Sequence, residues 1–308
     1  MKGYYQQRIS AVLVISIGLS PCLTAWDNQG HMMVAALAWK QLSSDTLRTR
    51  ATVLLKLNPD YSKWQSMIPV GTAAKEVPQM VFMIAATWPD EIKSEPGYIN
   101  DKTPSAANLG YSDKNQHRYW HFVDNPFTQD GSTLPAVPSP NAATQIAAFR
   151  TVIKSTKSDA LKSYDLVWLL HLVGDVHQPL HATTRVSTAD PKGDSGGNNV
   201  KCGSPCPSEL HGYWDDLLGT SNDPVAILAA ALALPAADPV AARIADESKW
   251  IAESFQLAKD DVYVMPIDKG DGPYTLTVYY ETKAKTVAQA RVALAGARLA
   301  TLINANLK

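Results

Sequence analysis

The stretch from His171 to His181 reads His-Leu-Val-Gly-Asp-Val-His-Gln-Pro-Leu-His. Its first half continues a nearly all-apolar run over residues 166–176, which predicts a buried helix. His171 and Asp175 are four residues apart, so on a helix they share one face. A buried helix rarely carries an ionisable pair without a partner, because an unpaired charge there costs several kcal/mol. A divalent cation is one partner that would satisfy both side chains.

A second pair with the same spacing lies downstream. His211 and Asp215 are again four residues apart, and His181 stands between the two pairs, just after the proline that ends the first helix. A single His-x3-Asp pair is commonly a hydrogen-bonded pair on a helix surface. Two such pairs joined by a further histidine favour a metal site, and imidazole nitrogen with carboxylate oxygen suits Zn2+.

The rest of the chain is dominated by helical patterns. Asp165 opens the central helix, and Asn141 is placed to cap a helix over 142–153. Apolar spacing predicts further helices at 30–42, 76–86, 209–218, 224–234, 237–260 and 282–307. The best strand signal is 274–280, as part of a small β-hairpin, and 124–140 and 187–207 are expected to be loops. We therefore expect one mostly α-helical domain over 26–308.

Three upstream motifs add candidate ligands. Trp26-Asp-Asn-Gln-Gly-His31 and Trp-Pro-Asp90-Glu-Ile-Lys93 each place a histidine or an acid near a tryptophan, and Tyr-Trp-His121-Phe122-Val-Asp124 flanks a histidine with aromatic residues. Taken singly, these motifs would be a tryptophan at the edge of the core, a turn and a half-buried strand. Together with the downstream pairs they extend one ligand series.

The first 25 residues differ from the rest of the chain. Lys2 and Arg8 precede an apolar run over 9–19 that is too short to span a bilayer, and no acid occurs in the segment. This pattern predicts a signal peptide at 1–25, cleaved before Trp26, and therefore an exported protein in the periplasm or secreted. An alternative is a lipoprotein box ending at Cys22, although the proline before that cysteine departs from the pattern. Only cleavage before Trp26 creates a free amine on that tryptophan.

Composition limits the classes of protein. With 45% hydrophobic residues the chain can bury a core, and 28 basic against 29 acidic residues exclude a strongly basic protein that coats nucleic acid. Beyond the signal peptide only Cys202 and Cys206 remain. In an exported protein this pair predicts a small disulfide loop, with a two-cysteine metal clip as the alternative.

In chain order, the candidate ligands resemble those of the S1/P1 nuclease family of exported zinc-dependent nucleases, and Gly196-Gly197-Asn198 resembles its glycine-rich substrate loop. The ligands in this series are Trp26, His31, Asp90, His121, His171, Asp175, His181, His211 and Asp215. The resemblance spans the whole chain after residue 25. It implies a mostly α, phospholipase C/P1 nuclease-like fold and three zinc ions.

The resemblance also assigns the ligands. It implies that Asp90, His121, His171 and Asp175 hold the first zinc and that His181, His211 and Asp215 hold the second. The third would be held by the Trp26 amine and carbonyl, His31 and Asp175, so that Asp175 bridges two metals. His117 and His177 would lie outside the cluster, with His177 a structural histidine.

The implied reaction is hydrolysis of single-stranded DNA and RNA to 5′-phosphorylated products, with 3′-nucleotidase activity. Two cations that share Asp175 would lower the pKa of a bridging water, and another would bind the departing 3′ oxygen. Asp90 and Lys93 would assist at the phosphate, with a solvated surface lysine as the alternative for Lys93. Phe122 would stack a base, or else pack in the core.

The remaining substrate contacts would come from Asp124, Gly197 and Asn198. No stable protein partner or membrane association is implied, and we expect a monomer.

Two alternative functions remain. Zinc-dependent phospholipase C has a longer gap after its N-terminal tryptophan and usually glutamate where this chain has Asp215, and a zinc-storage protein would not need Lys93 or Phe122.

Overall fold

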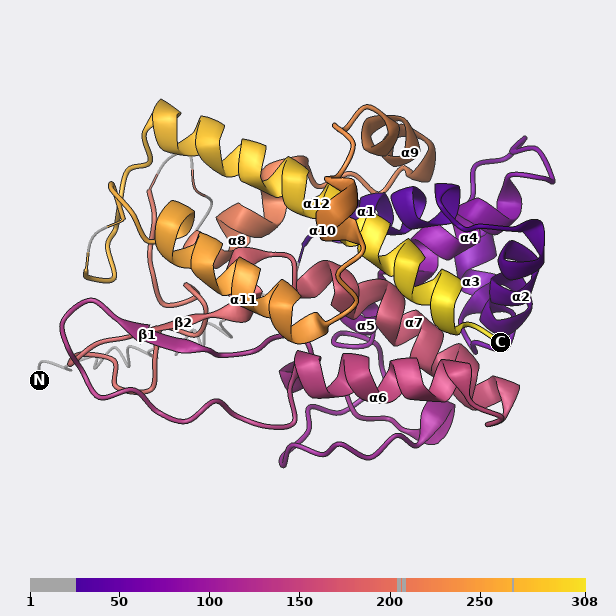
Figure 1. Ribbon diagram of the computed structural model, residues 1–308, viewed down its shortest axis with the longest axis horizontal. Coiled ribbons are helices and arrows are strands. Elements are labelled where there is room, and N and C mark those ends of the chain that lie inside the picture. Colours follow the sequence, from indigo (N-terminus) through magenta and orange to yellow (C-terminus); the bar gives the residue numbers. More distant parts are fainter. Residues whose placement is uncertain (1–25, 204–205, 207–208, 268) are drawn as a thin grey trace, which may run out of the picture.

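The computed structural model describes residues 26–203, 206, 209–267 and 269–308. The described chain is mostly α-helical, as predicted, with helices packed around a central helix, α7 (Figure 1). The main helices are α1 (Asn28–Lys40), α2 (Asp45–Leu55), α3 (Tyr61–Ser66), α4 (Val77–Ala85), α5 (Trp88–Glu91), α6 (Ala142–Lys154), α7 (Asp159–Asp175), α8 (Leu210–Asp215), α9 (Pro224–Leu232), α10 (Pro239–Ala242), α11 (Glu247–Leu257) and α12 (Val278–Asn306). Short 3-10 turns lie at Gly110–Ser112, Arg118–Trp120, Pro179–Ala182 and Asp216–Leu218, and a π-helical turn follows α11 at Ala258–Val262.

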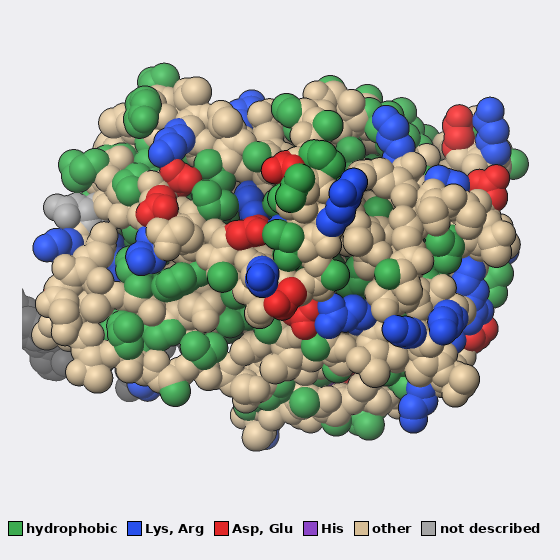
Figure 2. All heavy atoms as spheres, viewed as in Figure 1, with side chains coloured by type: hydrophobic (Ala, Val, Ile, Leu, Met, Phe, Trp, Pro, Cys, Tyr) green, Lys and Arg blue, Asp and Glu red, His purple; other side chains and the backbone are tan. Residues whose placement is uncertain are grey.

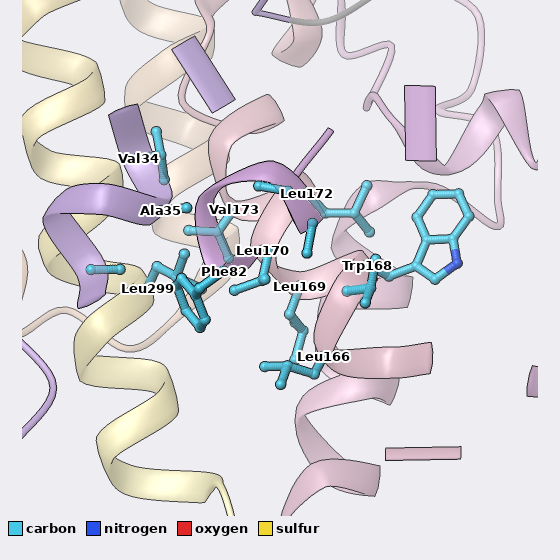
Figure 3. Packing of buried hydrophobic residues seen from close by; sticks show 14 of the residues in the cluster. Val34, Ala35, Phe82, Leu166, Trp168, Leu169, Leu170, Leu172, Val173 and Leu299 are labelled. Carbon is cyan, nitrogen blue, oxygen red and sulfur yellow. The ribbon is translucent and has the colours of Figure 1, made fainter. Parts of the chain in front are cut away.

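Helix α7 forms the centre of the core. It starts earlier than predicted, at Asp159, because the Ser158 side chain accepts a hydrogen bond from the backbone of Leu161 and caps it. From Lys162 to Asp175 every residue is buried. Figure 3 shows leucines of α7 facing residues of α1, α4 and α12, while Trp168 points to another side of the helix. An all-round apolar helix of this kind is stable only when it is enclosed by other elements.

The long C-terminal helix α12 packs closely on α1 (Figure 1). Gly296 permits this contact, since a Cβ atom there would lie 2.5 Å from the Cβ of Leu37. The same helix supplies two buried arginines to a polar cluster. Arg298 Nη1 lies 3.0 Å from His177 Nε2, and Arg291 and Arg298 both donate to the carboxylate of Glu253 on α11.

His177 is therefore the structural histidine that we predicted. Its Nδ1 lies 2.7 Å from the carbonyl oxygen of Val173, while its other nitrogen faces Arg298. Burial lowers the pKa of His177 well below its ordinary value, and the two arginines add to that effect. The neutral ring links the end of α7 to α12.

The predicted strand at 274–280 and its hairpin are wrong. Residues 278–280 belong to α12, and Tyr274 forms only an isolated bridge with Cys202. The two described strands, β1 (Pro126–Thr128) and β2 (Thr184–Val186), pair in parallel. Parallel strands need a long connection, and here α6 and α7 supply it, so this pairing has no local signal. Strand β1 falls within the segment that was expected to be a loop.

Other boundaries also differ from the predictions. The helix expected over 237–260 is divided into α10 and α11, because Asp238 and Asp246 each cap a new helix start. Helices α2 and α3 were not predicted; α2 is largely polar and buries only Ala51, Leu54 and Leu55. The sulfur atoms of Cys202 and Cys206 lie at bonding distance, which supports the predicted disulfide loop. No helix in the described ranges has the length and apolarity needed to cross a membrane.

Candidate metal centre and substrate cavity

Eight of the predicted ligand side chains converge on one region. They come from α1 (His31), α5 (Asp90), the turn before β1 (His121), α7 (His171 and Asp175), the turn after α7 (His181) and α8 (His211 and Asp215). They form three overlapping or adjacent groups whose ligand atoms lie within 4.8 Å of one another: His31, His171 and Asp175; Asp90, His121 and His171; and His181, His211 and Asp215. All seven histidines of the chain are buried, and none is visible on the face shown in Figure 2.

Asp175 lies between two of these groups. Its Oδ2 is 3.0 Å from His121 Nδ1 and 3.3 Å from His171 Nε2. Its Oδ1 is 3.3 Å from His31 Nε2. Asp90 completes the first set, with Oδ1 3.5 Å from His171 Nε2 and 3.7 Å from His121 Nδ1. The two oxygens of one carboxylate thus face different ligand sets, as a bridging role requires.

The neighbouring residue on α7 makes room for His31. A Cβ atom at Gly174 would lie 3.0 Å from His31 Nδ1, which is closer than most such contacts. The Gly174 carbonyl accepts a hydrogen bond of 3.1 Å from the indole of Trp26. Trp26 is fully buried beside the cluster, but residues 1–25 lie outside the described part. The ligand role of its backbone amine and carbonyl therefore stays a prediction.

The third group is built on α8 and the turn after α7. His181 Nε2 and His211 Nε2 lie 3.0 Å apart, and His211 Nε2 lies 3.4 Å from Asp215 Oδ2. The other oxygen of Asp215 accepts a hydrogen bond of 2.8 Å from the Gln178 amide. Two ring nitrogens that face each other at this distance suit a shared cation.

Backbone carbonyls orient three of the histidines. His171 Nδ1 lies 2.7 Å from the Ala86 oxygen, His181 Nδ1 lies 2.9 Å from the His121 oxygen, and His211 Nδ1 lies 2.7 Å from the Gly196 oxygen. A proton on each Nδ1 leaves the Nε2 lone pair directed into the cluster. Metal-binding histidines are commonly oriented by such hydrogen bonds.

The unsatisfied atoms of the cluster fit a cation. Both ring nitrogens of His31, Asp90 Oδ2 and Asp175 Oδ1 are buried without a hydrogen-bond partner among the described residues. Buried polar atoms normally have partners, so lone pairs gathered without enough donors to satisfy them indicate a missing positive charge. These nitrogen and oxygen atoms are the donor set that zinc prefers.

The pKa values of the cluster follow from its burial. Burial lowers the pKa of His31, His121 and His181 well below the ordinary histidine value, so these rings are neutral and able to donate a lone pair. Burial raises the pKa of Asp175 to about 8, so its charged form needs a nearby cation. For Asp90 burial is again the largest cause and acts in the same direction, but Lys93, His171 and His121 together outweigh it, and the pKa lies well below the ordinary value.

A cavity of about 170 Å³ opens beside the ligands. It is lined by three cluster histidines together with Lys93, Arg118, Phe122, Asp124, Leu180, Ser195, Gly196 and Asn198. Phe122, Asp124 and Asn198, for which we predicted substrate contacts, thus line one cavity together with three cluster histidines. Gly197 does not line this cavity; it is buried, and its amide donates to Asp194.

Two further features of the cavity concern charge. Lys93 is buried and its Nζ donates a 2.6 Å hydrogen bond to Asp90 Oδ1, so it lies at the ligand cluster rather than on the surface. Burial raises the pKa of Asp124 to about 6, with a smaller contribution from the negative charge of Asp194. The enclosure of the cavity therefore shifts the titration of Asp124 to a higher pH.

Asp194 holds the glycine-rich loop and was not predicted. Its Oδ1 accepts from the backbone amides of Arg185 and Gly197, and its Oδ2 accepts from the Tyr263 hydroxyl at 2.8 Å. Ser195 has a left-handed backbone, with φ of 55°. Arg118, Leu180 and Ser195 were also missed as lining residues, because none of them is itself part of the ligand spacing. His117 lies outside the ligand groups, as expected, between Asp101 and Asp113.

Comparison with known proteins identifies the family of the chain. The chain is 25% identical over 215 residues to the protein named Endonuclease 3 of Arabidopsis thaliana, an alignment that covers 68% of this chain and 60% of that relative's length. The family model of the S1/P1 nucleases matches residues 26–308, a range that contains every candidate ligand. The chain therefore belongs to the S1/P1 nuclease family.

Proposed function

We propose that this nuclease is a zinc-dependent phosphodiesterase that hydrolyses single-stranded DNA and RNA to 5′-phosphorylated products and has 3′-nucleotidase activity. The observation that carries the proposal is the buried Asp175 carboxylate, whose two oxygens face separate histidine sets beside a cavity. We further propose that the working protein is an exported monomer that begins at Trp26.

Three zinc ions would be held by the residues of the three ligand groups, with the Trp26 amine and carbonyl as additional ligands of the ion at His31. Zinc held there supplies Lewis acidity, which lowers the pKa of water and stabilises a departing 3′ oxygen. Every ligand side chain is buried. Burial lowers the local dielectric constant, which strengthens each charge interaction at the phosphate.

Lys93 would stabilise the phosphate as negative charge develops on it. Its ammonium is already positioned by Asp90 at the edge of the cavity, so little ordering is needed when a substrate binds. Asp90 orients this ammonium and also belongs to a ligand group.

The same cavity would hold a base. Phe122 offers a ring for stacking, and the Asp124 carboxylate accepts a hydrogen bond from a base N–H when it is ionised. Asn198 can donate to or accept from the same base. A duplex keeps its bases stacked, so an enclosed pocket of this kind favours single strands.

The proposal can be tested by incubating zinc-loaded protein with single-stranded DNA, RNA, 3′-AMP and phosphatidylcholine. We expect cleavage of the first three and 5′-phosphate ends on the polynucleotide products, with about three zinc ions per chain by elemental analysis. Cleavage of phosphatidylcholine alone, or full nuclease activity with fewer than two zinc ions per chain, would contradict it.

Replacing Asp175 by asparagine should remove zinc and activity together. The loss should exceed the roughly 10- to 100-fold that deletion of a supporting partner of a metal ligand costs. Asp165→Asn is the matched control, because Asp165 is a second fully buried aspartate on α7. Burial raises the pKa of Asp165 to about 8, so a neutral asparagine suits that site and should keep both zinc and activity. Equal losses in the two variants would argue against the bridging role.

The role of Asp124 predicts a pH dependence. Because its pKa is raised to about 6, the carboxylate is charged above pH 6 and becomes protonated as the pH falls through 6. Asp124→Asn should therefore lower kcat/KM for 3′-AMP by roughly 10- to 100-fold at pH 7.5, and the difference from wild type should shrink below pH 6. A constant ratio across pH 5 to 8 would contradict the assignment.

The proposed terminus gives a further prediction. A chain that starts with an extra methionine before Trp26 has an amide at Trp26 in place of an amine, and an amide nitrogen is no lone-pair donor. It should bind one zinc ion fewer and lose activity, compared with a chain of identical sequence that starts at Trp26. Unchanged zinc content and activity would rule out the amine as a ligand.

A further inference from the structure

We propose that Arg118 binds the substrate phosphate next to the one that is cleaved, and so favours polynucleotides over mononucleotides. The inference rests on the proposed nuclease function and adds a binding residue to it. Arg118 lines the cavity beside Lys93 and Phe122 and is half-buried. Among the described residues no carboxylate lies within ion-pair distance of its guanidinium.

An unpaired cation in this setting indicates an anionic ligand. Charged side chains that are withdrawn from water are normally paired, since the loss of hydration must be offset. Lys93 already has the Asp90 carboxylate at 2.6 Å, whereas Arg118 faces the cavity with no such partner. The planar guanidinium fork matches the oxygens of a phosphate diester.

The guanidinium is held in place by neutral acceptors. Its Nε donates to Gln116 Oε1 at 2.8 Å, and its Nη2 donates to the Lys93 carbonyl at 3.2 Å. The Gln116 amide donates to the same carbonyl at 3.0 Å, and Gln116 itself is buried. These contacts fix the orientation of the group without neutralising its charge.

The neighbouring His117 fixes the backbone of this segment. It adopts a left-handed conformation with φ of 46°, and its ring stacks on Trp120 with centroids 3.6 Å apart. Its two nitrogens each lie 2.9 Å from a carboxylate oxygen, of Asp101 and Asp113. A histidine in this backbone region is uncommon and persists only where its surroundings hold it. The result is a pre-arranged position for Arg118.

The position of Arg118 relative to Lys93 favours the neighbouring phosphate. The Lys93 ammonium lies at Asp90, within the ligand cluster where cleavage is proposed. The Arg118 guanidinium donates a hydrogen bond to the backbone carbonyl of Lys93, at the other end of that lysine. The two cations are thus anchored at opposite ends of one lysine, so a single phosphate at the ligand cluster leaves Arg118 available for the next one along the strand.

The test combines protein and substrate changes. The reference trithymidylate has two phosphodiester linkages, and cleavage at each is followed separately from its products. In the two comparison trimers, either the 5′ or the 3′ linkage is an uncharged methylphosphonate, so that only the other linkage is a phosphodiester. In wild type we expect one of the two methylphosphonates to lower kcat/KM by about tenfold. In Arg118→Gln that methylphosphonate should have no further effect, and KM for 3′-AMP should stay within about twofold of wild type.

Controls separate binding from folding and from net charge. Arg243→Gln makes the same charge change at an exposed site that lines a different groove, and it should behave as wild type. Arg118→Lys keeps the positive charge but loses the planar guanidinium group. It should therefore retain part of the preference for the phosphodiester over the methylphosphonate. Zinc content and thermal unfolding should match wild type in all three variants.

Salt provides an independent readout. For binding of a phosphorothioate oligothymidylate, which is cleaved slowly, the slope of log K against log salt concentration should fall by about 0.7 in Arg118→Gln, as for one lost phosphate contact. An unchanged slope, or equal losses on 3′-AMP and trithymidylate, would overturn the assignment. If wild type cleaves neither substrate, the proposed function fails instead.

Discussion

The structure depends on the burial of one carboxylate at the end of a fully enclosed helix. Asp175 is the last residue of α7, it is inaccessible to water, and its pKa is raised by burial. The C-terminus of a helix carries partial negative charge, which adds to the cost of a carboxylate there. A charge in this position needs cations, and the neighbouring rings of His31 and His121, whose pKa values burial lowers, offer lone pairs rather than positive charge. The site thus holds more lone pairs than its own donors satisfy.

Much of the remaining fold keeps these acceptors in position. Carbonyls from the segment after α4, from the turn before β1 and from the glycine-rich loop orient the histidine rings. On the other side, the cluster of His177, Glu253, Arg291 and Arg298 ties the end of α7 to α11 and α12. These contacts join segments that lie far apart in the sequence. They explain why the whole chain, rather than a local motif, makes the site.

The sequence predicts those features that leave a signal within a few neighbouring residues, such as a regular spacing or a helix cap. Spacing of four residues on an apolar helix identified the pairs on α7 and α8, and Asn141 marked the start of α6. The parallel pairing of β1 with β2 has no such signal, since α6 and α7 separate the strands. Arg118 and Asp194 escaped notice for the same reason. Their importance comes from what the fold places beside them, namely the Lys93 carbonyl and the Gly197 amide.

The cavity is lined by several chemically different kinds of side chain. Three histidines of the ligand cluster line the cavity, and Lys93 and Arg118 bring positive charge to it. In the proposed function Phe122 would stack a base and Asp124 would accept a hydrogen bond from it. The chain carries a formal charge of −1, so a positive region for nucleic acid has to be local. This distribution explains how a chain without an overall basic character can accept a polyanion.

The most direct test of the central claim is the anomalous scattering of zinc-loaded crystals, measured above and below the zinc absorption edge. We expect three peaks: two within bonding distance of Asp175, one at each of its oxygens, and a third at His181, His211 and Asp215. A single peak, or peaks that leave Asp175 without a metal contact, would contradict it.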